Sequence, residues 1–310
     1  LSQLEVCPPG EGALGVFADE VGEQVFPVFV LQLQGAHGRM VPGTHLHEFI
    51  IGFAEAFEKV AGEADDELMK VSARYHAAVC ALELEHEDGE YLLTAFIREH
   101  PESTLARRAY FQLGKFQFGN GKYARALESF EEVEVAELDR DERVEYYYKK
   151  GYSQYRTGQP ARAKASFSRV LNTESEYSPY ATYYYAVIAF EEGDDATARE
   201  NFEKVASDRS FRKSVDIYLI HLYHRAGEYE RLPSLAEPAF DDASGKEKPA
   251  IAMMIGDAYY QTEDYAAALP WFEFYERSSR REMSRETAYE IGYTYFMNED
   301  FRAATPNFQQ

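Results

Sequence analysis

Three short stretches of the sequence contain residue types that could bind a phosphate group or a metal ion. The first, Gly114–Lys122, has three glycines and two lysines, a composition shared with phosphate-binding loops. It lacks the Gly-Lys-Ser/Thr ending of such a loop, and its apolar spacing places it across a helix and a turn instead of between a strand and a helix. We therefore predict a structural role for this stretch.

The other two stretches are pairs of histidines. His45 and His47 are separated by one residue, whereas His221 and His224 are three apart and share one face of a predicted helix. Imidazoles at the second spacing can bind one metal ion, but a third ligand at a suitable spacing is missing from the sequence. The sequence therefore predicts no metal site and no other cofactor.

Catalytic groups cannot be assembled from local motifs either. The carboxylates occur in solvated runs such as 131–132 and 139–142, and no set of Ser, His and acid is recognisable by its motif. Cys7 and Cys80 are too few for a disulfide framework and have no metal ligand at short spacing. We expect a protein that is not an enzyme; a catalytic domain outside this sequence stays an alternative.

The stretch Gly114–Lys122 and the pair His221 and His224 belong to a repeated unit that must position them. The stretch 109–133 recurs at 146–170, shifted by 37 residues. Its landmarks Gly114, Gly121, Ala126, Phe130 and Val133 correspond to Gly151, Gly158, Ala163, Phe167 and Val170. Apolar residues at helical spacing on both sides of Gly121 predict a helical hairpin. Small residues are predicted where its two helices cross, and a large ring where the second helix meets the next hairpin.

This pattern resembles the tetratricopeptide repeat family, whose unit has Leu-Gly, a turn glycine, an alanine and an aromatic over about 34 residues. Six copies follow one another, with turns at Gly121, Gly158, Gly193, Gly227, Glu263 and Glu299. Two departures stand out. The fourth copy has Pro233 and Pro238 in its second helix, which predicts a short or irregular helix. The first two copies have Gln117 and Gln154 where the family has an aromatic residue.

The resemblance implies an all-α fold, a right-handed α-solenoid of helical hairpins. We place the array at 44–310, with a degenerate repeat at about 68–101 and clearer repeats at about 107–140, 144–178, 179–210, 213–245, 249–281 and 285–310. The last copy is truncated, so we expect a longer array. Residues 1–43 do not follow the pattern, and the sequence predicts no fold for them. Two explanations stay as alternatives: a small capping element, or a segment that results from a reading-frame error.

Charge and hydropathy restrict the partners. The 310 residues have a net charge of −22, which opposes binding to nucleic acid or to anionic lipid surfaces. No window approaches the roughly 20 apolar residues that span a bilayer. We therefore expect a protein or peptide partner, no nucleic acid and no direct membrane insertion, and the sequence does not predict an oligomeric state.

In the family, the first helices line a concave groove with residues three before, one after and four after the conserved small residue. The corresponding positions that we predict to bind the partner are Phe111, Lys115, Phe118, Tyr148, Tyr152, Tyr155, Tyr183, Phe190, His221, His224 and Tyr260. We expect about half of the rings to pack against the next hairpin instead. We place Tyr148 and Tyr152 in the groove, so that their truncation should spare folding. Repeats that clamp an acidic C-terminus have Lys and Asn here, and only Lys115 matches.

The resemblance implies a non-catalytic scaffold that holds a partner in this aromatic groove. Long, acidic, Tyr-rich arrays are similar to bacterial cell-envelope repeat proteins that help to assemble or secrete outer-membrane and surface proteins. The periplasm or cell envelope and the cytoplasm both stay open as compartments. The alternative function is a regulatory or substrate-recruiting part of a larger enzyme.

Overall fold

The computed structural model describes residues 45–84, 88–278 and 283–309. In these ranges there are fifteen α-helices, one 3-10 helix and no strand, which confirms the all-α fold class. The segment 1–43, for which the sequence predicts no fold, lies outside the described residues.

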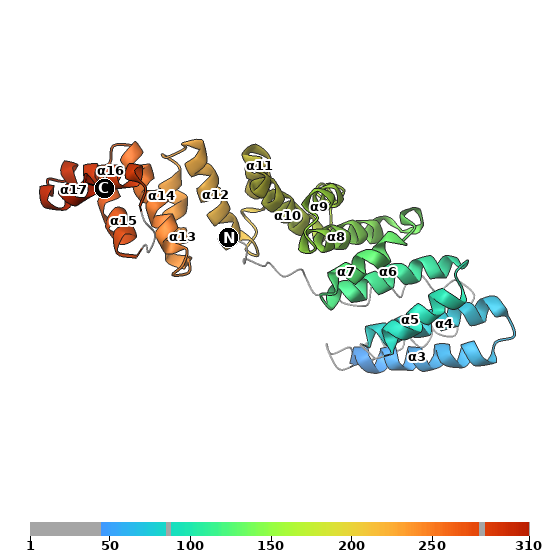
Figure 1. Cartoon of the computed structure of the whole chain (residues 1–310). Coiled ribbons are helices and arrows are strands. Elements are labelled where there is room, and N and C mark those ends of the chain that lie inside the picture. The colour runs from blue at the N-terminus through green and yellow to red at the C-terminus, as the bar shows by residue number, and fades with distance from the viewer. Residues whose placement is uncertain (1–44, 85–87, 279–282, 310) are drawn as a thin grey trace. The chain divides into compact units, whose positions relative to one another are not determined.

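Successive helices form hairpins joined by short turns (Figure 1). In chain order they are α3 His45–Glu63, α4 Glu67–Glu83, α5 Gly89–Glu99, α6 Thr104–Gly119, α7 Tyr123–Glu131, the 3-10 helix Val135–Glu137, α8 Arg140–Arg156, α9 Pro160–Phe167, α10 Tyr177–Glu192, α11 Asp195–Val205, α12 Arg212–Ala226, α13 Leu232–Asp242, α14 Lys248–Gln261, α15 Tyr265–Ser278, α16 Arg285–Met297 and α17 Phe301–Asn307.

The described helices fall into two compact units, divided between Ala181 and Thr182 within α10. In the N-terminal unit each helix from α3 to α9 packs on the next, and in the C-terminal unit the same holds from α11 to α17. The first helices of neighbouring hairpins also touch. In the N-terminal unit α6 contacts α8, and in the C-terminal unit α12 contacts α14 and α14 contacts α16. Each repeat thus completes the core of the one before it.

Small residues lie where the two helices of a hairpin cross, as predicted. A Cβ atom added to Gly256 would come within 2.7 Å of the Phe272 ring, and one added to Gly114 within 2.5 Å of the Phe130 ring. Both rings are fully buried. Glycine is therefore required at these positions, because the ring of the paired helix packs directly against it. Phe130 fills the crossing of its own hairpin and also contacts Tyr146 of the next hairpin.

The turn of every copy has the same backbone conformation. All six turn residues have positive φ, from 62° at Glu263 to 79° at Gly193. The next amide closes the helix end, as when Asp264 N donates to Tyr259 O at 2.9 Å. Glycine adopts this left-handed conformation without a Cβ clash, so the two glutamates are strained where four glycines are not.

Glu263→Gly is expected to raise the free energy of unfolding by about 0.5 to 1 kcal/mol, because it relieves the Cβ clash at positive φ. Urea unfolding of the two proteins measures the difference. The matched control is Glu273→Gly inside α15, which should instead lower stability by about 0.5 to 1 kcal/mol. Destabilisation by both substitutions would contradict the strain at Glu263.

Polar pairs explain the glutamines in the first two copies. Ser129 Oγ donates to Gln117 Oε1 at 2.7 Å, joining α7 to α6, and the hydrogen bond repeats from Ser166 to Gln154 at 2.7 Å. All four residues are buried. The glutamine at the family's aromatic position is thus matched by a serine on the second helix.

The second helix of the fourth copy is predicted from the sequence to be short or irregular, and the first of these alternatives is wrong. Helix α13 runs over 11 residues, as long as α11 and longer than α7 or α9. Pro233 lies in the first turn of α13, where a missing N–H is tolerated, and only Pro238 lies inside the helix. Burial of Leu232 and Ala236 supports the helix through packing.

Candidate binding face

Three of the rings predicted to line the groove are buried. Phe111, Tyr148 and Tyr183 expose 1% of their surface or less. Tyr148 stacks on Tyr177 with 5.0 Å between ring centroids, and its burial raises the pKa of its phenol well above the usual value. These side chains have no surface to offer a partner. We correct their assignment from groove to core.

Phe118 and Tyr152 also belong to the packing between hairpins. Their ring centroids are 5.5 Å apart, and Tyr152 lies 5.5 Å from Tyr123 of α7. Arg156 Nη1 donates to the Tyr152 hydroxyl at 2.9 Å. Both rings are buried, so Tyr152 joins α6, α7 and α8 and does not form the open patch that the sequence predicts.

Lys115 is held by the chain itself. Its Nζ lies 3.1 Å from Glu145 Oε1, and Lys149 Nζ lies 2.8 Å from the same oxygen. Both contacts have ion-pair distances without the directions of a hydrogen bond. The three side chains are at most 11% exposed. A lysine paired in this way is not available to clamp a partner's carboxylate.

The remaining predicted positions keep part of their surface exposed. They are Tyr155 in the N-terminal unit and Phe190, His221, His224 and Tyr260 in the C-terminal unit. Arg225 lies over the Phe190 ring at 4.3 Å. Burial lowers the pKa of the His221 imidazole, and the charges of Arg225 and His224 act in the same direction.

Exposed rings gather at the corresponding positions of α16. Tyr289 is 54% and Phe296 47% exposed, and Tyr293 between them is partly exposed. The Tyr293 centroid lies 6.1 Å from those of Tyr289 and Tyr260. We call the surface formed by His221, His224, Asp257, Tyr260, Tyr289, Glu290, Tyr293 and Phe296 the α12–α16 face.

Polar groups occupy the middle of the α12–α16 face. His224 Nε2 lies 2.7 Å from Asp257 Oδ2, and Gln261 Nε2 donates to Asp257 Oδ1 at 3.0 Å. Glu290, only 9% exposed, has no hydrogen bond or ion pair to its carboxylate from any described residue. Burial raises the pKa of Glu290 to about 7, with a further contribution from the charge of Asp257. The face therefore combines open rings with a desolvated acid.

Models of the tetratricopeptide repeat match three segments, residues 108–134, 148–211 and 224–280. The chain carries tetratricopeptide repeats. The matches span helices from α6 to α15 and include the His224 and Asp257 pair. No curated protein sequence matches the chain.

Solved tetratricopeptide repeat structures resemble this one at low identity. MamA from Desulfovibrio magneticus RS-1 is 16% identical, with 54% of this chain and 92% of that chain covered and a TM-score of 0.44. A repeat protein from Parabacteroides merdae is 16% identical, covering 82% and 91%, with a TM-score of 0.42. PilF of Pseudomonas aeruginosa is 15% identical, covering 65% and 88%, with a TM-score of 0.42. At these values the likenesses say nothing about what this chain binds.

The repeat register contains a signal for Glu290 that sequence reasoning missed. Glu290 stands two residues before Gly292, the small residue of its copy. The same position is buried in the other five copies, at Gln112, Lys149, Tyr184, Tyr218 and Met254. Alignment of the repeats could therefore have predicted a buried carboxylate here, whereas we assigned the carboxylates to solvated runs.

Replacing Glu290 by glutamine is expected to remove a pH dependence of stability. Folding raises the pKa of this carboxyl from 4.5 to about 7 and so favours the protonated form. Its stabilising contribution is present below about pH 4.5 and is lost as the pH rises through about 7. Between about pH 5 and 8, the wild-type chain should lose of the order of 1 to 3 kcal/mol relative to Glu290→Gln. Urea unfolding across this range measures the difference, and parallel profiles would contradict it.

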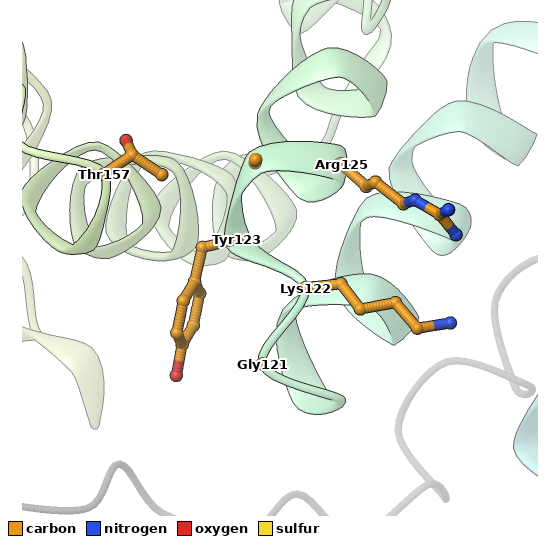
Figure 2. Close-up of a pocket in the computed structure, with 6 residues that line it drawn as sticks. Gly121, Lys122, Tyr123, Arg125 and Thr157 are labelled. Carbon is orange, nitrogen blue, oxygen red and sulfur yellow. The ribbon is translucent and has the colours of Figure 1, made fainter.

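A pocket of about 530 Å³ lies in the N-terminal unit beside the turn between α6 and α7. Figure 2 shows Tyr123 on one side of this turn and Lys122 and Arg125 directed to another. Lys122 Nζ lies 2.7 Å from Glu90 Oε2, and Arg125 Nη1 lies 3.8 Å from Glu90 Oε1. Because Glu90 on α5 already pairs with both cations, the pocket is not set up to bind an anion.

In residues 45–84, 88–278 and 283–309, no group of three or more His, Cys, Asp or Glu side chains is placed to hold a metal ion. Within the same ranges, every helix is too short or too polar to cross a membrane.

Proposed function

We propose that the chain is a protein-binding scaffold and that the α12–α16 face holds a segment of the partner protein. The observation that carries this proposal is that Phe190, His221, His224 and Tyr260, on the successive first helices α10, α12 and α14, each keep part of their surface exposed. Exposed aromatic side chains supply large contact area at low entropic cost and are enriched where proteins bind proteins.

The partly exposed positions extend this face along the first helices. Phe190, His221, His224 and Tyr260 belong to the proposed site, because each keeps surface that a partner can reach. Tyr155 offers a smaller, separate contact in the N-terminal unit. The repeat boundaries stated from the sequence are part of the same proposal, since they define which helices are the first of each hairpin.

A role in the assembly or secretion of envelope proteins is the finer form of this proposal. It rests on the similarity of long, acidic, Tyr-rich arrays to bacterial cell-envelope repeat proteins. The net charge of −22 supports a protein partner over nucleic acid in either compartment.

Site-specific cross-linking tests the scaffold proposal. A photo-reactive residue placed at Tyr289 in the host cell should cross-link to a discrete partner, whereas one at Tyr91, 65% exposed on α5, should not. With the purified partner, Tyr289→Ala should weaken binding by about tenfold or more, as expected for a hot spot. Tyr91→Ala is the matched control. Equal loss, or no loss, in both variants would contradict the assignment of the face.

A further inference from the structure

Acidic and basic residues are segregated along the chain around the second copy of the repeat. Residues 146–173 contain no Asp or Glu and six Lys or Arg. The preceding stretch 123–139 contains six acids and one basic residue, and the following stretch 174–208 contains nine acids and two basic residues. Residues 146–173 thus carry a concentrated positive charge in a chain whose net charge is −22.

The exposed part of this charge lies on the second helix of the hairpin. Lys149 is buried, and Arg156 lies over tyrosine rings. Arg162 in α9 and Arg169 in the turn after it are both exposed, and their spacing of seven residues places them on one face of the helix. We call the surface formed by the exposed residues Arg162, Ala165, Ser168 and Arg169 the α9 face.

The first copy shows how the chain offsets positive charge by itself. Residues 103–127 also contain no acid and have five basic residues. Each of the five lies within ion-pair distance of a glutamate from another helix: Arg107 with Glu137, Arg108 with Glu142, Lys115 with Glu145, and both Lys122 and Arg125 with Glu90. The positive charge of this stretch is therefore offset within the chain.

The acid that offsets Arg125 has no counterpart for Arg162. Arg162 stands 37 residues after Arg125, at the same position of the next copy. The residue 37 positions after Glu90 is Leu127, which is buried and uncharged. Arg162 Nη1 instead donates to Gln159 Oε1 at 3.1 Å, a neutral amide that does not offset its charge. This difference lies in the sequence of an interior copy, with further copies on both sides.

The size of the α9 face favours a short ligand. Helix α9 has eight residues, which is about 12 Å of helix. Helix α7 packs on α8 and has the exposed acids Glu128 and Glu131. A nucleic acid or an anionic membrane surface extends well beyond one such helix and would meet this acidic charge. The carboxylates of a short protein segment can lie on α9 alone.

We propose that the α9 face binds a short acidic segment of a partner protein, with Arg162 and Arg169 as its contacts. Guanidinium groups donate paired, charge-assisted hydrogen bonds to carboxylates. The positive charge of residues 146–173 also attracts an acidic segment during encounter. The α9 face shares no residue with the α12–α16 face, so this inference goes beyond the proposed function and does not depend on it.

Fluorescence anisotropy with defined peptides tests the α9 face. The probes are two labelled 12-residue peptides of Gly and Ser with four regularly spaced glutamates or, in the second, glutamines. At low salt the wild-type chain should bind the glutamate peptide at least about tenfold more tightly than the glutamine peptide, and added salt should reduce this preference. Replacing Arg162 and Arg169 together by glutamine should weaken binding of the glutamate peptide by about tenfold.

The matched control replaces Arg98 and Arg209, two exposed arginines elsewhere in the chain, by glutamine. This equal change of charge should alter the affinity for the glutamate peptide by less than about twofold. Thermal melts establish that both double variants are folded, which is expected because all four side chains are exposed.

Several results would overturn the inference. They are failure of the wild-type chain to bind the glutamate peptide, equal binding of the two peptides, and equal losses in the two double variants. Tighter binding of a 12-nucleotide oligothymidine, or of phosphatidylserine vesicles, than of the glutamate peptide would overturn the choice of a protein segment. The variant that lacks Arg162 and Arg169 should still cross-link to a partner through Tyr289, and this measurement separates a failure of the α9 face from a failure of the α12–α16 face.

Discussion

Tyr148→Ala is expected to lower the free energy of unfolding by about 3 to 5 kcal/mol. The Tyr148 side chain has no exposed surface and touches rings from three other helices: Phe118 of α6, Phe167 of α9 and Tyr177 of α10. Truncation would leave a cavity between consecutive hairpins that these large rings cannot close without moving. Urea unfolding followed by circular dichroism measures the change.

Two control variants separate packing from other effects. Tyr148→Phe removes only a hydroxyl that has no hydrogen-bond partner among the described residues, so it should be neutral or slightly stabilising. Tyr91→Ala truncates a mostly exposed tyrosine and should change stability by about 0.5 kcal/mol or less. A decrease of less than about 1 kcal/mol in the free energy of unfolding of Tyr148→Ala would contradict the burial of this side chain and support the groove that the sequence predicts.

The error at Tyr148 shows what periodicity can and cannot establish. Helical spacing correctly placed the small residues at the crossings and the six turns between helices, because both depend on local backbone geometry. Exposure of a ring on the first helix depends on how closely the next hairpin approaches. Tyr177 and Phe167 cover Tyr148, and that approach is set by long-range packing of large rings that one sequence does not specify.

The candidate face was partly predictable. His224 and Asp257 are 33 residues apart, close to one repeat, and both are groove positions in the family pattern, so their contact follows from the repeat register. The burial of Glu290 was equally accessible from that register. The charged groups that surround Glu290 could not be predicted in this way, because they depend on which side chains of α12 and α14 come near.

Glu145→Gln is expected to lower the free energy of unfolding by about 3 kcal/mol. Glu145 on α8 is the shared partner of Lys115 and Lys149, and all three side chains are at most 11% exposed. Lys115 also lies over the Phe111 ring and Lys149 over the Phe118 ring, so neither ammonium can turn to water without disturbing the core. Neutralising the acid removes the ion pairs that both ammonium groups make with Glu145 at a site largely shielded from water.

The physical cause of this loss can be isolated with two further proteins. Glu137→Gln breaks the ion pair with Arg107, in which the Glu137 side chain is 31% and the Arg107 side chain 48% exposed. It should lower the free energy of unfolding by less than about 1 kcal/mol. Replacing Glu145, Lys115 and Lys149 together by Met should restore stability to within about 1 kcal/mol of wild type, because all three charges of the cluster are then removed together. If the triple substitution is as damaging as Glu145→Gln alone, the loss comes from packing and not from the broken ion pairs with Glu145. Chemical unfolding at pH 7 decides between these two causes. Added salt should not lower the stability of the Glu137→Gln protein further, since its exposed ion pair is already gone.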